Sequence, residues 1–303
     1  MDKMNFIQFT EEIVNKIKAY LPENYLESKI MLKSVIKNNG LTLTALVIYN
    51  ESNISPSVYL EGFYEKYKAG MEMEDILRKI AELRIKKELD DAFDISMILD
   101  FDKVKNFIIP KLIKENWNKT MLKNRPHTDY SNLTITYHIV LEKNDSSFAS
   151  MPVTDLLMKH WGIDLEAIHK LAIGNMKIIL PSVFKSINEM IKTIDPSVDL
   201  NNPCFSCAEK NMYVLSNEII MFGATALLDE EVMNKIEEKI GKEFYVLPSS
   251  VHEVIIIPKL SDNDVFCLSS MVREMNNNYL SCEDRLSDNI YKYTHDKGLT
   301  MVA

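Results

Sequence analysis

Glycine and cysteine are scarce in this chain, which has 8 glycines and 4 cysteines among its 303 residues. Loops that cradle phosphate groups need closely spaced glycines, and neither G-x-G-x-x-G nor G-x-x-x-x-G-K-[S/T] occurs. So few cysteines do not make a disulfide scaffold, and in a reducing compartment free thiols are the default. The sequence therefore predicts a protein without a phosphate-cradling loop, a disulfide framework or a bound cofactor.

Long apolar runs are missing as well. No stretch approaches the roughly 18 apolar residues that a membrane-spanning helix requires. The start of the chain, MDKMNFIQFTEEIVNKIKAY, carries acidic residues within its apolar part, which is not the pattern of a signal peptide. We therefore expect a soluble cytoplasmic protein that does not enter a membrane.

Positive charge is not in excess, because 35 Lys and Arg residues face 44 Asp and Glu residues and the formal net charge is −9. The lysines are spread along the chain rather than clustered. Such a surface repels phosphate backbones and anionic membranes. We predict that the folded surface does not bind nucleic acid, which leaves a protein partner or a small ligand; the oligomeric state is open.

Two β-rich runs make up residues 244–259, FYVLPSSVHEVIIIPK, and flank a Pro-Ser-Ser break. Residues 254–257 are Val, Ile, Ile and Ile, whose β-branched side chains suit a pleated surface. A strand without a polar face is one that is covered on both sides. We predict that this segment is the central hairpin of a sheet.

A second hairpin is predicted at residues 29–49, where Asn39-Gly40 separates two β-rich runs. Helices are expected at residues 6–20, 72–89, 104–113 with a kink at Pro110, 153–161, 164–171, 182–194, 229–240 and 264–275. Further strands are expected at 133–141 with one buried face, at 212–215 and 221–227, and at the sheet edge at 289–293. This order favours an α+β fold with antiparallel or mixed sheets and helices packed over them.

The length of the chain suggests about two domains. We expect an N-terminal α+β domain at residues 1–125 and a C-terminal α+β domain at residues 126–303. A single compact domain is the alternative.

Four stretches carry a family resemblance: YLEGFYEKYKAGMEMEDILRKIAE at 59–82, LLMKHWGIDLEAIHKLAIGN at 156–175, FYVLPSSVHEVIIIP at 244–258 and LSDNIYKY at 286–293. Together they resemble a family of bacterial proteins known only as a domain of unknown function. The resemblance covers most of the chain in the same order and at about the same total length. It implies a bacterial, soluble, full-length single-chain product without an appended module, and it implies no activity, cofactor or catalytic residue.

Cys204 and Cys207 have the spacing of a redox pair or of two zinc ligands, since two intervening residues let both sulfurs reach one metal or each other. Zinc requires two more ligands. Cys267 and Cys282 are available, but they do not form a second C-x-x-C pair, and no histidine is close to either in sequence. We expect ordinary reduced cysteines.

A serine, a base and an acid occur together at Ser249, Ser250, His252 and Glu253, which suggests a hydrolase. Residues two apart on one strand lie about 6.5 Å apart, too far for the hydrogen bond that activates a serine. No G-x-S-x-G motif is present, and Ile256 stands where a helical zinc-protease motif requires a second histidine. Turn serines and a strand histidine are the favoured interpretation.

His127 and Asp129 could act as a base and the group that orients it, in a loop before a strand. A polar surface loop explains them equally well. The aromatic residues at 59, 63, 64 and 67 could form a ligand platform, but their helical spacing is more typical of a core.

Two classes of function remain. The favoured one is a non-catalytic binding or regulatory protein that acts through protein or small-ligand contacts, because each candidate catalytic group has a sufficient structural explanation. The alternative is a hydrolase whose site is assembled from distant residues such as His127, Asp129, His252 and Glu253.

Overall fold

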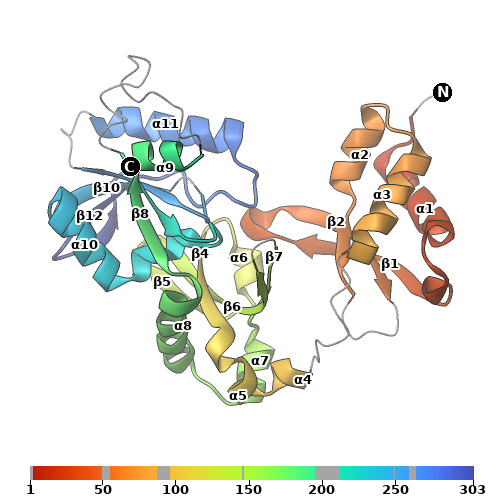
Figure 1. Ribbon diagram of the computed structural model, residues 1–303, viewed down its shortest axis with the longest axis horizontal. Coiled ribbons are helices and arrows are strands. Elements are labelled where there is room, and N and C mark those ends of the chain that lie inside the picture. The colour runs from red at the N-terminus through yellow and green to blue at the C-terminus, as the bar shows by residue number, and fades with distance from the viewer. Residues whose placement is uncertain are drawn as a thin grey trace. The chain divides into compact units, whose positions relative to one another are not determined.

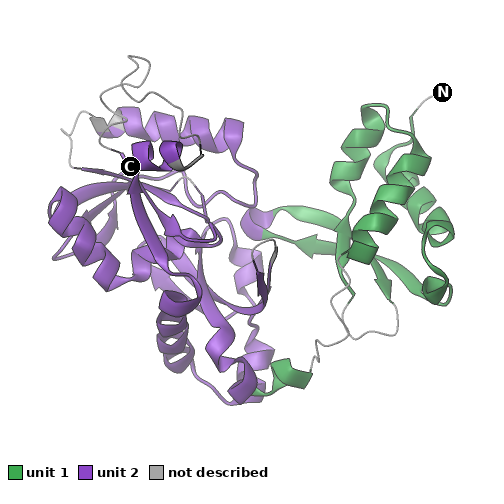
Figure 2. Cartoon of the chain, viewed as in Figure 1, with its two compact units in different colours: residues 1–37, 41–100 green, residues 38–40, 101–303 purple. Residues whose placement is uncertain are grey.

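The computed structural model describes residues 3–49, 55–86, 96–144, 147–194, 212–248, 250–258 and 264–303. These residues form helices and antiparallel sheets (Figure 1), so the predicted α+β class is confirmed. The chain divides into two compact units, the first made of Met1–Lys37 and Leu41–Asp100 and the second of Asn38–Gly40 and Phe101–Ala303 (Figure 2). The domain boundary expected at residue 125 stays a prediction.

The first unit contains a three-stranded antiparallel sheet in the order β1 (Lys29–Ile36), β2 (Thr42–Tyr49) and β3 (Ser57–Tyr59). β1 and β2 form the predicted hairpin. Its turn requires a left-handed backbone at Asn39 (φ 60°) and Gly40 (φ 71°), which these residue types adopt at low cost. The helices of this unit are α1 (Phe6–Lys16), 3-10 turns at Ile17–Tyr20 and Glu23–Tyr25, α2 (Glu61–Lys68), α3 (Met73–Lys86) and α4 (Ser96–Leu99).

An aromatic group packs into the core of the first unit. Phe9 is fully buried, and the rings of Tyr64 and Tyr67 lie 5.2 and 5.4 Å from its ring. Phe63 is half-buried against the same core, which also contains Leu46 from β2. The aromatic stretch after residue 59 therefore supplies core contacts, as its helical spacing indicates.

The larger sheet of the second unit has six antiparallel strands in the order β13 (Gly298–Met301), β12 (Tyr291–Thr294), β10 (Glu243–Leu247), β11 (Val254–Pro258), β9 (Tyr213–Asn217) and β8 (Ser182–Ser186). The pair β10 and β11 lies in its centre, which confirms the predicted central hairpin. Val254 and Ile256 are fully buried. The helices nearby are α9 (Ile187–Ile194), α10 (Glu230–Ile240) and α11 (Asp264–Tyr279), and α11 packs on Tyr245 and Leu247 (Figure 1).

A four-stranded sheet is built around the long strand β6 (Leu133–Asn144), which pairs with β4 (Ile108–Lys114) on one side and with β5 (His127–Tyr130) and then β7 (Ser147–Pro152) on the other. The surrounding helices are α5 (Phe101–Val104), a 3-10 turn at Lys105–Phe107, α6 (Lys119–Leu122), α7 (Asp155–Trp161) and α8 (Leu165–Ile179). α8 packs against β4, and Asn175 donates from Nδ2 to the Ile108 carbonyl at 2.9 Å.

Two helices begin at a capping aspartate. The Asp164 side chain accepts a hydrogen bond from the Ala167 amide at the start of α8. Asp229 accepts one from the Glu231 amide at the start of α10, and Gly241 with φ 105° ends that helix. Each aspartate satisfies an amide that has no partner within the first turn.

The helix predicted at residues 104–113 is wrong, because most of it is strand β4. Six of the seven residues of β4 are buried, so apolar side chains cover both faces and give no helical stripe of their own. Pro110 lacks an amide proton, yet it fits because β4 is an edge strand whose outer side needs no partner.

Four further expectations change. Residues 221–227 are not a strand but lead into the 3-10 helix Gly223–Leu228, in which residues 223–227 are all buried and show no alternation. The helix predicted from residue 182 begins only at Ile187, since Ser182–Ser186 pairs with β9 as β8. β12 is not an edge strand, because the chain turns back and β13 pairs with it. β6 has two buried faces rather than one over residues 133–140.

In the described part of the chain, no helix combines the length and the apolar character that crossing a membrane requires.

Candidate functional site

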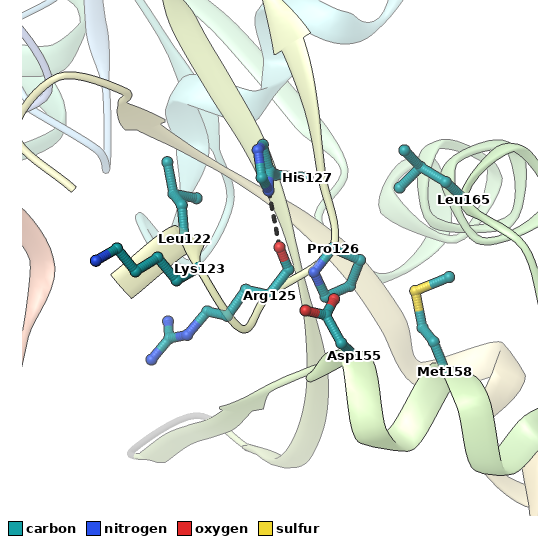
Figure 3. Close-up of a pocket in the computed structure, with 8 residues that line it drawn as sticks. All are labelled: Leu122, Lys123, Arg125, Pro126, His127, Asp155, Met158 and Leu165. Carbon is teal, nitrogen blue, oxygen red and sulfur yellow. Dashed lines mark hydrogen bonds between the residues drawn. The ribbon is translucent and has the colours of Figure 1, made fainter. Parts of the chain in front are cut away.

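A depression of about 430 Å³ opens in the second unit where the loop before β5 meets α7 and the start of α8. Figure 3 shows the residues that line it: Leu122, Lys123, Arg125, Pro126, His127, Asp155, Met158 and Leu165. This volume lies within the range of roughly 300–1,000 Å³ that small-molecule sites occupy. Four of these eight residues are apolar, and the other four carry charged or polar groups.

Backbone hydrogen bonds hold the segments of the depression together. The Arg125 amide donates to the Leu122 carbonyl at 3.2 Å and closes the turn after α6. The Asp155 amide donates to the Asn124 carbonyl at 3.2 Å and joins the first turn of α7 to the same loop. Pro126 then restricts the backbone directly before β5 begins. The loop that carries the charged side chains is therefore tied at both ends.

His127 has one ring nitrogen engaged and one available. Its Nδ1 lies 2.8 Å from the Arg125 carbonyl oxygen, and since a carbonyl only accepts, Nδ1 carries the proton and donates. In the neutral ring Nε2 is then an acceptor, and it makes no hydrogen bond to a residue that the structure describes. The ring can offer this nitrogen to a ligand.

Arg125 is a half-buried cation to which no described residue supplies an acidic partner. Its guanidinium makes no hydrogen bond or ion pair to any residue within the described ranges. Burial lowers the pKa of the Arg125 guanidinium. A cation that has lost part of its hydration without gaining a partner favours the arrival of an anion.

The charged and apolar groups of the depression are separated in space. The Lys123 and Arg125 side chains extend to one side of the loop, whereas Met158 and Leu165 lie on the other side (Figure 3). Asp155 lies beside the backbone of the loop, between the two groups (Figure 3). The depression thus has a cationic end and an apolar end.

Asp129 follows His127 by two residues on β5, so both side chains belong to the same face of the strand. Asp129 is exposed, and the partner of His127 Nδ1 is the Arg125 carbonyl instead. The structure therefore brings His127 into the depression and leaves Asp129 outside its lining.

His252 has both ring nitrogens engaged. Nδ1 accepts a hydrogen bond from the Phe222 amide at 3.3 Å, so Nε2 carries the proton and donates to Asp284 Oδ1 at 3.2 Å. The other oxygen of Asp284 accepts from Ser281 Oγ at 2.7 Å. His252 therefore joins two loops and has no free nitrogen with which to take a proton from a substrate.

Ser250 and Glu253 belong to the turn before β11. Ser250 Oγ accepts from the amides of His252 at 2.9 Å and Glu253 at 3.3 Å, which is the behaviour of a turn serine. Ser249 lies outside the described residues. The structure does not place Ser250 and the His252 ring in hydrogen-bond contact, so His252 does not activate Ser250.

Cys204 and Cys207 lie outside the described residues, so the expectation that they are ordinary reduced cysteines stays a prediction. Cys267 and Cys282 are free and exposed. Among the residues with described positions, no group of three or more His, Cys, Asp or Glu side chains could hold a metal ion.

Arg125, Asp155, Met158 and Leu165 line the depression but were not predicted as site residues. One local signal points to Arg125, since only 5 of the 35 cationic residues are arginines and this one directly precedes a proline. The apolar members have no such signal, because Met158 and Leu165 follow ordinary helical patterns.

Comparison with known proteins identifies a family and no activity. Residues 6–295 match the model of a family of unknown function, DUF5688, and the chain belongs to that family, which confirms the resemblance seen in the sequence. No curated protein matches, and neither does any solved structure.

Proposed function

We propose that this member of the DUF5688 family is a non-catalytic binding protein that holds a small ligand in the depression around His127. The observation that carries this proposal is the depression itself: it has the volume of a ligand site, an apolar part, and two polar side chains, Arg125 and His127, that offer unused hydrogen-bonding capacity. A non-catalytic role is favoured because no serine, threonine or cysteine is among the described residues that line the depression. Both ring nitrogens of His252 are engaged in hydrogen bonds between loops, which also supports a non-catalytic role.

The alternative is a hydrolase that uses His127 Nε2 as a base towards water. The accessible nitrogen is the observation in its favour. Purified protein would then turn over a generic ester, peptide or phosphoester substrate, and His127→Ala would abolish that turnover. His160→Ala on α7 is the control, since His160 is exposed and does not line the depression. Turnover that is lost with His127→Ala and kept with His160→Ala would overturn the non-catalytic proposal.

Ligand binding can be tested by saturation-transfer NMR against a library of small metabolite-like compounds. Met158→Glu places a carboxylate in the apolar end, and we expect it to weaken binding of a hit by about tenfold or more, since an unpaired charge at an apolar contact is unfavourable. Leu156→Glu is the matched control on the same helix, because Leu156 is 79% exposed and outside the lining. Hits that bind both variants as they bind the wild type, or a library without hits, would count against the proposal.

We also propose a bacterial origin, a cytoplasmic location and no affinity for nucleic acid. The first is supported by the family resemblance and the last by the net charge of −9. Retention of the protein on duplex DNA at physiological ionic strength would contradict the last statement.

A further inference from the structure

We propose that the ligand of the depression is a small monocarboxylate with an apolar chain, whose carboxylate pairs with Arg125 and whose chain lies against Met158 and Leu165. This inference rests on the proposed function and names the chemical class of its ligand. Three properties of the lining carry it.

The first property is the guanidinium of Arg125, which has no partner among the described residues. Arginine presents a planar fork of donors that matches both oxygens of a carboxylate. No described residue supplies such a group to Arg125, although its guanidinium is half-buried. A bound carboxylate would supply the two acceptors and the opposite charge at once. Burial, which lowers the pKa of Arg125, also strengthens an ion pair formed there.

The second property is the charge balance. Among the described residues of the lining, Lys123 and Arg125 are the cations and Asp155 is the one carboxylate, so one positive charge is left over when His127 is neutral. A single carboxylate neutralises this charge, whereas a phosphate dianion would exceed it and be repelled by Asp155. The charge balance therefore favours a monoanion.

The third property is the separation of the two ends. Met158 and Leu165 lie across the loop from the two cationic side chains (Figure 3). Methionine is flexible and adapts to apolar chains of different shape. A ligand with its charge at one end and an aliphatic chain at the other fits this arrangement, while a compact polar anion would leave the apolar end uncovered.

Isothermal titration with three probes tests this proposal: octanoate, octan-1-ol, which has the same chain length without the charge, and acetate, which has the charge without the chain. We expect the wild type to bind octanoate more tightly than either other probe. Arg125→Gln should weaken octanoate binding by about tenfold to a hundredfold, the usual effect of losing a charge-assisted hydrogen bond, and leave octan-1-ol unchanged. Arg273→Gln is the matched control, since Arg273 is exposed on α11 and does not line the depression.

Arg125→Lys is a second variant that controls for misfolding, because it keeps the positive charge and removes the planar fork of guanidinium donors. We expect it to bind octanoate with intermediate affinity. Equal affinity for octanoate and octan-1-ol, unchanged by Arg125→Gln, would overturn the carboxylate assignment and leave the proposed ligand site standing. If none of the three probes binds while library hits remain sensitive to Met158→Glu, the carboxylate assignment alone is wrong. If neither probes nor library compounds bind, both proposals are wrong.

Discussion

His138 lies within β6 with 7% of its surface exposed, and its Nδ1 atom has no hydrogen-bond partner among the described residues. The ring contacts the edge of Phe222, 5.4 Å away between centroids. Burial, together with the charges of Lys111 and Arg125, holds the pKa of His138 well below its usual range. The ring is therefore neutral in the folded protein and becomes charged on unfolding at mildly acidic pH.

Because His138 is neutral in the folded protein and charged in the unfolded chain at acidic pH, we expect the free energy of unfolding to decrease as the pH falls. Below the unfolded-state pKa of about 6.5 the unfolded chain binds one more proton at His138 than the folded chain, so the free energy of unfolding decreases by up to about 1.4 kcal/mol per pH unit from this group. His138→Leu removes the titrating group, and urea denaturation between pH 5 and 7 should show a flatter dependence than the wild type. His160→Gln, at an exposed histidine, should keep the wild-type slope. Equal slopes for His138→Leu and the wild type would contradict the assignment.

The residues of the depression show what a sequence reveals at this scale. His127 can be selected from sequence because histidine is a common acid or base and the position precedes a strand. The sequence marks Arg125 only by the rarity of arginine and by the proline that follows it. It does not reveal that the guanidinium lacks a partner among the described residues, because that depends on every side chain that folding brings near it. His252 illustrates the converse: its neighbours Ser250 and Glu253 suggest chemistry, but its real partners, Phe222 and Asp284, are about 30 residues away in sequence on either side.

At the scale of elements, the local sequence predicts a turn or a helix end where a single residue type determines the backbone geometry. Asn39-Gly40 marks the hairpin of β1 and β2, and Asp164 and Asp229 mark the starts of α8 and α10. β4 was mistaken for a helix because its side chains are buried on both faces, which removes the alternation that distinguishes strand from helix. Whether both faces of β4 are covered depends on the elements that pack on it, and the sequence of the strand itself does not show this.

The 3-10 helix Gly223–Leu228 packs closely against the turn before β11. A Cβ atom at Gly223 would lie 2.1 Å from the His252 carbonyl oxygen and 2.2 Å from Ser216 Oγ of β9. The 3-10 helix could then not keep its present contacts with the turn before β11 and with β9. We expect Gly223→Ala to lower the free energy of unfolding by about 1–3 kcal/mol, the usual effect of overpacking a core. Urea denaturation measures this change.

Gly174→Ala is the matched control within α8, where a Cβ atom would meet nothing within 4 Å. It should raise the free energy of unfolding by about 0.5–1 kcal/mol, because alanine is the better helix former. A stability of Gly223→Ala equal to that of the wild type would show that the turn before β11 moves aside at no cost.

At the scale of the whole molecule, the pairing of β4 affects where the boundary between two folding units can lie. β4 precedes residue 125 in sequence, but it pairs with β6 along all seven of its residues. It also carries Lys114, which is buried and donates to Asn289 Oδ1 at 2.8 Å. A fragment that starts at residue 126 would lose an entire strand of the four-stranded sheet and leave one side of β6 without hydrogen-bond partners over residues 133–139.

We therefore expect two fragments to behave differently. The fragment of residues 101–303 keeps every strand of both sheets of the second unit and should unfold cooperatively in urea. The fragment of residues 126–303 lacks β4 and should unfold without a cooperative transition, or aggregate, because an interior strand has become an exposed edge. Circular dichroism and size-exclusion chromatography distinguish these outcomes. Cooperative unfolding of the shorter fragment would place the boundary between folding units at residue 125, as expected from the sequence. It would also mean that β6 and the core beneath it are stable without the pairing to β4.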